Sequence, residues 1–203
     1  MANQDISQLH TEALELLKQL IATPSFSKEE NETAEILIHF FAQKGIEHFR
    51  VGNNVYAKNK FYDASKPSVL LNSHHDTVKP NTAYTKDPFK AIVEDGKLYG
   101  LGSNDAGGCL VSLIATFTHF YNHTDLKYNL ILAATAEEEI SGKNGVESIL
   151  EVLGKIDFRG HAPGRRVGDG GLRMGTTCWG NAGRGACGFA ASPSGRGARG
   201  GRG

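Results

Sequence analysis

The chain has 203 residues, no formal net charge and 39% hydrophobic residues, which is enough for one domain with a sizeable core. Its three widely spaced cysteines exclude the disulfide framework of a small secreted domain. The polar first ten residues lack signal-peptide features, and no apolar run approaches the ~18 residues of a membrane span, so we expect a cytoplasmic protein with no membrane partner.

The neutral charge is the sum of two unlike segments. Residues 1–158 carry 14 basic and 21 acidic side chains, or −7, and 13 of the basic residues are lysines. Residues 159–203 carry eight arginines, no lysine and one acid, or +7, and hold 15 of the 25 glycines. We therefore predict a folded part over 1–158 and a disordered Gly/Arg-rich tail over 159–203.

The first half of the folded part predicts two helices and then two strands. Apolar residues at helical spacing indicate the first helix: Leu9, Ala13, Leu16, Leu17, Leu20 and Ile21. Residues 25–45 predict the second, with Ser27 as N-cap and Glu30 three residues later completing a capping box. Residues 46–51 and 53–59 predict short strands around an Asn-containing turn.

The second half continues the alternation of strands and helices. It predicts strands over 68–73, 97–99 and 128–136 and helices over 109–121 and 145–154, with Asp105 or a near neighbour opening the first of these helices. Alternating elements with continuously apolar strands are typical of an α/β fold. We therefore expect a mostly parallel sheet flanked by helices.

Polar clusters follow three of the predicted strands. They are His74-His75-Asp76, Asn104-Asp105 and Glu137-Glu138-Glu139. Each cluster alone is compatible with ordinary surface residues, and the glycines around Asp105 with a phosphate-binding turn, although the Lys and Ser/Thr of a P-loop are absent. Because ligands bind at the carboxyl ends of strands in such sheets, the three clusters together favour a metal site. Imidazole and carboxylate groups suit Zn²⁺, Mn²⁺ or Co²⁺.

These motifs, in this order over residues 7–158, resemble the M20 family of metallohydrolases. His74 to Asp76 matches the family's His-x-Asp motif, residues 85–89 its T-x-DPF stretch, residues 99–108 its Gly-rich motif, and residues 135–142 its Glu-Glu motif. The resemblance implies a di-zinc peptidase-like catalytic domain, of which the chain would hold an incomplete N-terminal part.

The resemblance also implies roles for five residues. His74 and Glu139 would each ligate one of two Zn²⁺ or Co²⁺ ions, Asp105 would bridge both ions, Asp76 would orient the site, and Glu138 would act as general base. Glu137 would be an ordinary acid at a helix start, and His75 would not be a ligand. Gly100, Gly102 and Gly107 would permit tight turns around Asp105.

The activity implied by the resemblance is hydrolysis of the amide bond of an N-acyl amino acid. N-acetylornithine is the expected substrate, because the Asn-Asp-Ala-Gly stretch at 104–107 resembles a subset related to acetylornithine deacetylase. A dipeptidase or carboxypeptidase of the same family, acting on short peptides, is the alternative. Intact members of the family are often homodimers.

The tail lacks the ligands that the resemblance would add. An acidic ligand is expected near Pro163 and a His near the C-terminus of the intact protein, but Gly, Ala, Arg and Pro make up 31 of the last 45 residues. We favour a frameshifted or misjoined tail and a truncated, inactive chain. The alternatives are a non-catalytic fragment and an Arg/Gly arm that binds RNA, although nucleic acid is the less favoured partner.

Overall fold

The computed structural model describes residues 5–153, so the expected boundary at residue 158 and the tail at 159–203 lie outside the described residues. The helices are α1 (Ile6–Ala22), α2 (Asn31–Gln43), α3 (Gly108–Phe120) and α4 (Val146–Leu153), with short turns η1 (Ser103–Gly107) and η2 (Glu138–Ile140). The strands are β1 (His48–Val51), β2 (Asn54–Lys58), β3 (Ser68–His74), β4 (Ile92–Glu94), β5 (Lys97–Tyr99) and β6 (Asn129–Thr135).

The main sheet has four strands in the order β1-β2-β6-β3, and β4 and β5 form a separate hairpin. β3 and β6 are parallel, whereas β1–β2 and β2–β6 are antiparallel. The expected α/β class is confirmed, but the sheet of the described residues is mixed rather than mostly parallel. Only two residues separate β1 from β2, which permits a hairpin alone, whereas the crossover through α3 allows β6 to run parallel to β3.

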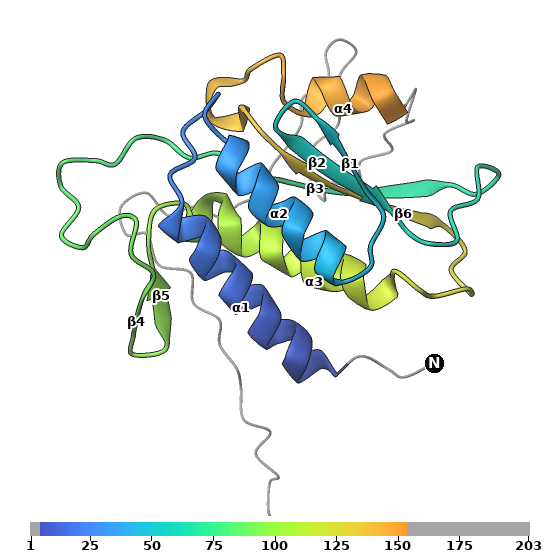
Figure 1. Ribbon diagram of the computed structural model, residues 1–203, viewed down its shortest axis with the longest axis horizontal. Coiled ribbons are helices and arrows are strands. Elements are labelled where there is room, and N and C mark those ends of the chain that lie inside the picture. The colour runs from blue at the N-terminus through green and yellow to red at the C-terminus, as the bar shows by residue number, and fades with distance from the viewer. Residues whose placement is uncertain (1–4, 154–203) are drawn as a thin grey trace, which may run out of the picture.

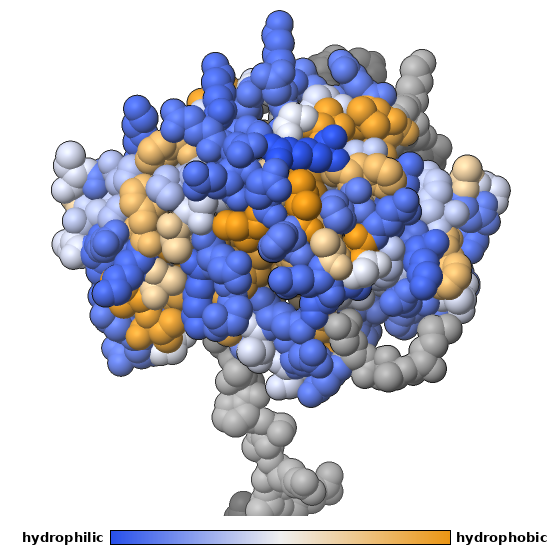
Figure 2. Space-filling model, viewed as in Figure 1, coloured by the Kyte–Doolittle hydropathy of each residue, from blue (hydrophilic) through white to orange (hydrophobic). Residues whose placement is uncertain are grey.

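The main core lies between one face of this sheet and the helices α1, α2 and α3, which lie together in Figure 1. Leu37, Phe41 and Phe117 are fully buried there, and each such side chain contributes about 1.5–3 kcal/mol by leaving water. α4 packs on the opposite face through Ile149, against Tyr56 and Ala133. Figure 2 shows the outer face of α1 and α2 as mostly hydrophilic, with smaller apolar patches between polar side chains.

The start of α2 differs from the expected capping box. The helix begins at Asn31, and no side chain caps it. The Ser27 hydroxyl instead donates to Oδ2 of Asp76 at 2.7 Å, and the Glu30 carboxylate accepts from the backbone N–H groups of Lys28 and Glu137. The capping-box prediction was therefore wrong: Ser27 binds a side chain that follows β3, and Glu30 binds a backbone group that follows β6 as well as the N–H of Lys28.

None of the helices among residues 5–153 combines the length and the apolar character that a bilayer-spanning segment needs.

Candidate metal centre

The strand order brings the predicted site residues together. β3 and β6 are parallel neighbours in a register that pairs His74 with Thr135, so both strands end at the same edge of the sheet. His74 is the last residue of β3, and Glu138 and Glu139 begin η2 three residues after β6. Asp105 reaches the same place from η1, immediately before α3.

Three of the side chains form a compact set of ligand atoms. One ligand atom each from His74, Asp105 and Glu139 lies within 4.8 Å of the others. His74 Nε2 lies 3.2 Å from Oδ1 of Asp105 and 3.6 Å from Oε2 of Glu138. His74 is 2% exposed, whereas the side chains of Asp105 and Glu138 are 64% and 40% exposed. The cluster therefore combines a buried imidazole with carboxylates that are open to solvent.

Asp76 is fully buried and connects β3 with the loop after β6. Its Oδ1 accepts from the backbone N–H of Glu138 and its Oδ2 from that of Glu139, both at 3.1 Å. Oδ2 also accepts from the hydroxyl of Ser27. The Nδ1 atom of His74 lies 3.0 Å from the backbone oxygen of Asp76, and an N–H there leaves Nε2 free to bind a metal. Asp76 therefore holds the backbone of Glu138 and Glu139 and lies against His74 without being in the cluster itself.

The charges of the cluster shift the pKa values of its members. Burial lowers the pKa of His74, but the hydrogen bond and charge of Asp76 and the charge of Glu138 outweigh it and raise the pKa to about 9. Burial raises the pKa of Asp76, but hydrogen bonds from His74, Ser27 and the two backbone N–H groups leave it below its usual value. Burial and then the charge of Asp105 raise the pKa of Glu139. Carboxylates crowded in this way favour a bound cation.

The backbone that carries Asp105 depends on two glycines. Gly102 has φ +71°, in the left-handed region that favours glycine, and the N–H of Gly107 donates to its carbonyl oxygen at 2.8 Å. A Cβ at Gly107 would lie 2.7 Å from that oxygen and from Cδ1 of Leu17. The expected glycine-rich turn is present, and of the residues expected to open α3, it is the near neighbour Gly108 rather than Asp105 that begins the helix.

His75 is buried and lies on the other side of the chain from the cluster. Its Nε2 lies 3.0 Å from the backbone oxygen of Asn53, and its Nδ1 lies 2.9 Å from the hydroxyl of Thr33. Burial lowers the pKa of His75 to about 4, so the ring is neutral at pH 7. Both ring nitrogens have protein partners, consistent with the interpretation that His75 is not a metal ligand.

Glu137 stands at the start of the short helix η2, as the sequence suggested, but it is buried rather than solvated. It is 7% exposed, with φ +53°, and its Oε1 accepts from the side-chain amide of Asn144 at 2.9 Å. It therefore closes the loop that follows β6. Sequence reasoning missed this role and those of Ser27 and Glu30, because the partners Asn144, Asp76 and the N–H of Glu137 lie 7, 49 and 107 positions away. A search of the sequence for acidic residues near serine or asparagine would not have distinguished Glu30 and Glu137 from acids on the surface.

The donor set fits a transition-metal ion. One imidazole nitrogen and two carboxylates, with the imidazole oriented by hydrogen bonding at its other nitrogen, match the ligand preferences of Zn²⁺ and Co²⁺. Glu138 is beside this set but outside it, as a residue that exchanges protons would need to be. The described residues supply these three ligand candidates, fewer than two fully coordinated ions need.

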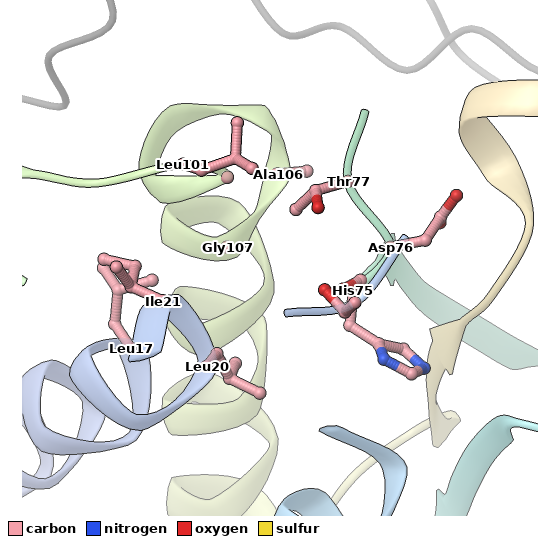
Figure 3. A pocket seen from close by; sticks show the side chains of 11 residues that line it. Leu17, Leu20, Ile21, His75, Asp76, Thr77, Leu101, Ala106 and Gly107 are labelled. Carbon is pink, nitrogen blue, oxygen red and sulfur yellow. Dashed lines mark hydrogen bonds between the residues drawn. The ribbon is translucent and has the colours of Figure 1, made fainter. Parts of the chain in front are cut away.

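A small cavity lies behind the cluster, between α1, η1 and the end of β3. Figure 3 shows Leu17, Leu20 and Ile21 of α1 on one side of it and the segment from His75 to Thr77 on the other. Its volume of about 20 Å³ is that of a single water site rather than of a substrate. In Figure 3 the Asp76 carboxylate points away from α1, toward the loop after β6, in agreement with its hydrogen bonds.

The sequence matches a known protein family and several known proteins. The pattern of peptidase family M20/M25/M40 matches residues 70–177, which is more than half of the chain. Among curated relatives, the succinyl-diaminopimelate desuccinylase of Buchnera aphidicola is 32% identical over 161 residues, covering 74% of this chain and 42% of that protein. The corresponding enzyme of Rickettsia bellii is 29% identical, covering 70% and 39%. The chain therefore spans about two fifths of the length of these relatives.

Solved structures agree with the fold. An M20 family metallo-carboxypeptidase from Sulfolobus solfataricus is 27% identical, with a TM-score of 0.58, over 69% of this chain and 34% of that one. A Bacillus subtilis protein described as a dinuclear metal-binding peptidase of the M20 family is 21% identical, with a TM-score of 0.55, over 72% and 40%. At that lower identity, the second similarity shows a shared fold alone.

Proposed function

Because this chain belongs to peptidase family M20/M25/M40, we propose that it carries part of the active site of a metal-dependent hydrolase that cleaves the amide bond of an N-acyl amino acid. The observation that supports this most is the grouping of His74, Asp105 and Glu139 within 4.8 Å beside the unligated Glu138. The family membership makes the protein a hydrolase by descent, while the reaction of this chain is part of the proposal.

In this proposal His74, Asp105 and Glu139 would hold Zn²⁺ or Co²⁺, with two ions expected in the intact site. Such ions, when bound, lower the pKa of a water molecule and stabilise negative charge on the substrate oxygen. Glu138 accepts the proton of the attacking water at its carboxylate, as the water oxygen bonds to the amide carbon. The same carboxyl group then delivers the proton to the departing nitrogen when the C–N bond breaks. Asp76 keeps Glu138 and Glu139 in place through their backbone N–H groups.

The identity of the acyl group on the substrate is a more specific part of the proposal. Both curated relatives described above are named succinyl-diaminopimelate desuccinylases, which makes an N-succinyl amino acid the first substrate to test. N-acetylornithine, favoured by the motif at 104–107, is the second. A peptide substrate is the third, since the Sulfolobus relative is a carboxypeptidase. Cytoplasmic location stays a prediction, and homodimer formation is expected of intact family members alone.

Metal binding is the primary test, because we expect negligible turnover from this chain alone. Titration of the metal-free protein with Co²⁺, followed by visible absorption, should show one site. His74→Ala and Glu139→Ala should each weaken binding at least about 10-fold, since each removes a ligand. The exposed His39→Ala and Glu29→Gln serve as matched controls. Equal affinity in all five proteins would refute the proposed centre.

Hydrolysis is the second measurement. The three substrates are incubated with the Co²⁺-loaded and Zn²⁺-loaded chain, and released amine is measured. Any turnover should be lost in Glu138→Gln, which removes the proton acceptor but keeps the size of the side chain. Turnover that persists in Glu138→Gln would exclude this residue as the general base. Salt-sensitive RNA binding that disappears on deletion of 159–203 would instead favour the Arg/Gly alternative.

A further inference from the structure

A second buried carboxylate, Glu30, lies behind the candidate metal centre. Its side chain is fully buried, immediately before α2. Oε1 accepts from the backbone N–H of Lys28 at 2.7 Å and from that of Glu137 at 3.1 Å, and Oε2 accepts from Nδ2 of Asn53 at 2.8 Å. All three partners are donors, as an ionised carboxylate requires. Burying such a group costs free energy unless it is fully hydrogen-bonded, and the three donors around Glu30 offset that cost.

The hydrogen bond between Glu30 and the backbone N–H of Glu137 is one of three similar hydrogen bonds in the loop after β6. Three successive backbone N–H groups after β6 are held by carboxylates from distant segments: Glu137 by Glu30, and both Glu138 and Glu139 by Asp76. Glu137 has a left-handed backbone conformation, and it is the residue that turns the chain from β6 into η2. Fixing the N–H of Glu137 therefore fixes the direction in which the next two side chains leave the sheet.

Glu30 is itself oriented by the turn between β1 and β2. Asn53 donates to Glu30 through Nδ2 and accepts at Oδ1 from Nη2 of Arg50 at 3.0 Å. The backbone oxygen of Asn53 is the partner of His75 Nε2. Glu30 is thus a member of a polar network that connects the β1–β2 turn, the end of β3 and the loop after β6.

From these contacts we infer that Glu30 is a positioning residue for the metal ligand Glu139 and the proton acceptor Glu138, acting through the backbone N–H of Glu137. This inference rests on the proposed function for its chemical consequence. Glu30 touches none of the ligand atoms: its effect passes through a backbone hydrogen bond to the residue that precedes them.

The first test measures the position of the loop without metal. Amide exchange of Glu137 to Glu139 is followed by NMR in the metal-free protein. Glu30→Ala removes the acceptor altogether, so the Glu137 amide should exchange on the order of 10- to 100-fold faster. In Glu30→Gln the carboxamide presents its N–H₂ group either to the Glu137 N–H, which then loses its acceptor, or to Nδ2 of Asn53, which breaks the contact that orients the side chain, so exchange at Glu137 should also be faster. The exposed neighbour Glu29→Gln is the matched control and should leave exchange unchanged.

A compensating variant distinguishes hydrogen bonding from general disruption. In Glu30→Gln with Asn53→Asp, the carboxylate introduced at position 53 can accept from the N–H₂ group of the carboxamide introduced at position 30 and still accept from Arg50. Exchange at Glu137 should therefore return to within about 3-fold of the wild-type rate, as expected when both hydrogen bonds are restored. Unchanged exchange at Glu137 in Glu30→Ala, which has no side-chain acceptor, would overturn the inference.

The second test measures the consequence for the ligand. The Co²⁺ dissociation constant should rise about 10-fold in Glu30→Gln, but by less than about 2-fold when the substitution is made in a Glu139→Ala background. An equal rise in both backgrounds would overturn the inference, since Glu30 would then act on overall stability. If the wild-type chain binds no Co²⁺, the proposed function fails, and the exchange experiment still decides whether Glu30 positions the loop.

Discussion

Acidification should destabilise the metal-free protein through His75. This ring is 5% exposed, and its two nitrogens lie against Asn53 and Thr33. Burial is the main cause of its lowered pKa of about 4, compared with 6.5 for an ordinary histidine. The unfolded chain therefore binds a proton at this position more readily than the folded protein. The stabilising contribution is complete above pH 6.5 and is lost as the pH falls toward 4.

The magnitude follows from the two pKa values. At pH 7 the unfolded and folded forms of this side chain are both mostly neutral. At pH 5 the unfolded form is almost fully protonated while the folded form is mostly neutral, so the free energy of unfolding should be lower by about 2 kcal/mol than at pH 7. His74 has a raised pKa of about 9 and contributes in the opposite direction as the pH falls, so a comparison with a variant is needed.

The assay is urea denaturation at pH 7 and pH 5 in the presence of a chelator. His75→Gln keeps a donor for the Asn53 oxygen but does not titrate. The variant should be less stable at pH 7, because the Thr33 hydroxyl loses its contact with the ring and keeps only the backbone oxygen of Glu30. The fall in its free energy of unfolding toward pH 5 should nevertheless be about 2 kcal/mol smaller than in the wild type. Identical pH dependence in the two proteins would refute the assignment of a buried neutral His75.

Two further substitutions test the backbone around the centre. Asp76→Asn should lower the free energy of unfolding by about 2–3 kcal/mol in urea denaturation and weaken Co²⁺ binding 10- to 100-fold, because an amide cannot accept from both Glu138 and Glu139; a loss of stability with unchanged affinity would contradict an orienting role. Gly107→Ala should cost about 1–3 kcal/mol, measured as a shift in the urea midpoint, because its Cβ would lie 2.7 Å from a backbone oxygen. A Gly107→Ala protein as stable as the wild type would show that this turn can open.

The sequence allowed the three polar clusters to be placed at one edge of the sheet because that argument needed little three-dimensional detail, whereas the choice of His74, Asp105 and Glu139 within the clusters came from the resemblance to the M20 family. Continuous apolar strands separated by a helix indicate parallel neighbours, and parallel neighbours end at the same edge of a sheet. The structure has this arrangement for β3 and β6. The hairpin of β1 and β2 was likewise visible in two short strands around an Asn-containing turn.

The supporting carboxylates could not be predicted in the same way. Ser27 and Glu30 match a capping box by local spacing, but their partners, Asp76 and the N–H of Glu137, lie 49 and 107 positions away. Glu137, as the first acid of three, matches a solvated helix start, yet it is buried against Asn144. Local sequence patterns predict hydrogen bonds between residues a few positions apart. These side chains instead bind groups that are distant in the sequence and come close only in the folded protein.

The position of β3 in the sheet has a consequence for solubility. β3 pairs with β6 on one side, and among the described residues no other strand pairs with it. Its outer row of backbone N–H and C=O groups is a template for strand addition by another chain. Since His74 ends this strand, a chain that docked there would change the surroundings of the metal ligand. Self-association of the protein and its affinity for metal should therefore vary together with protein concentration.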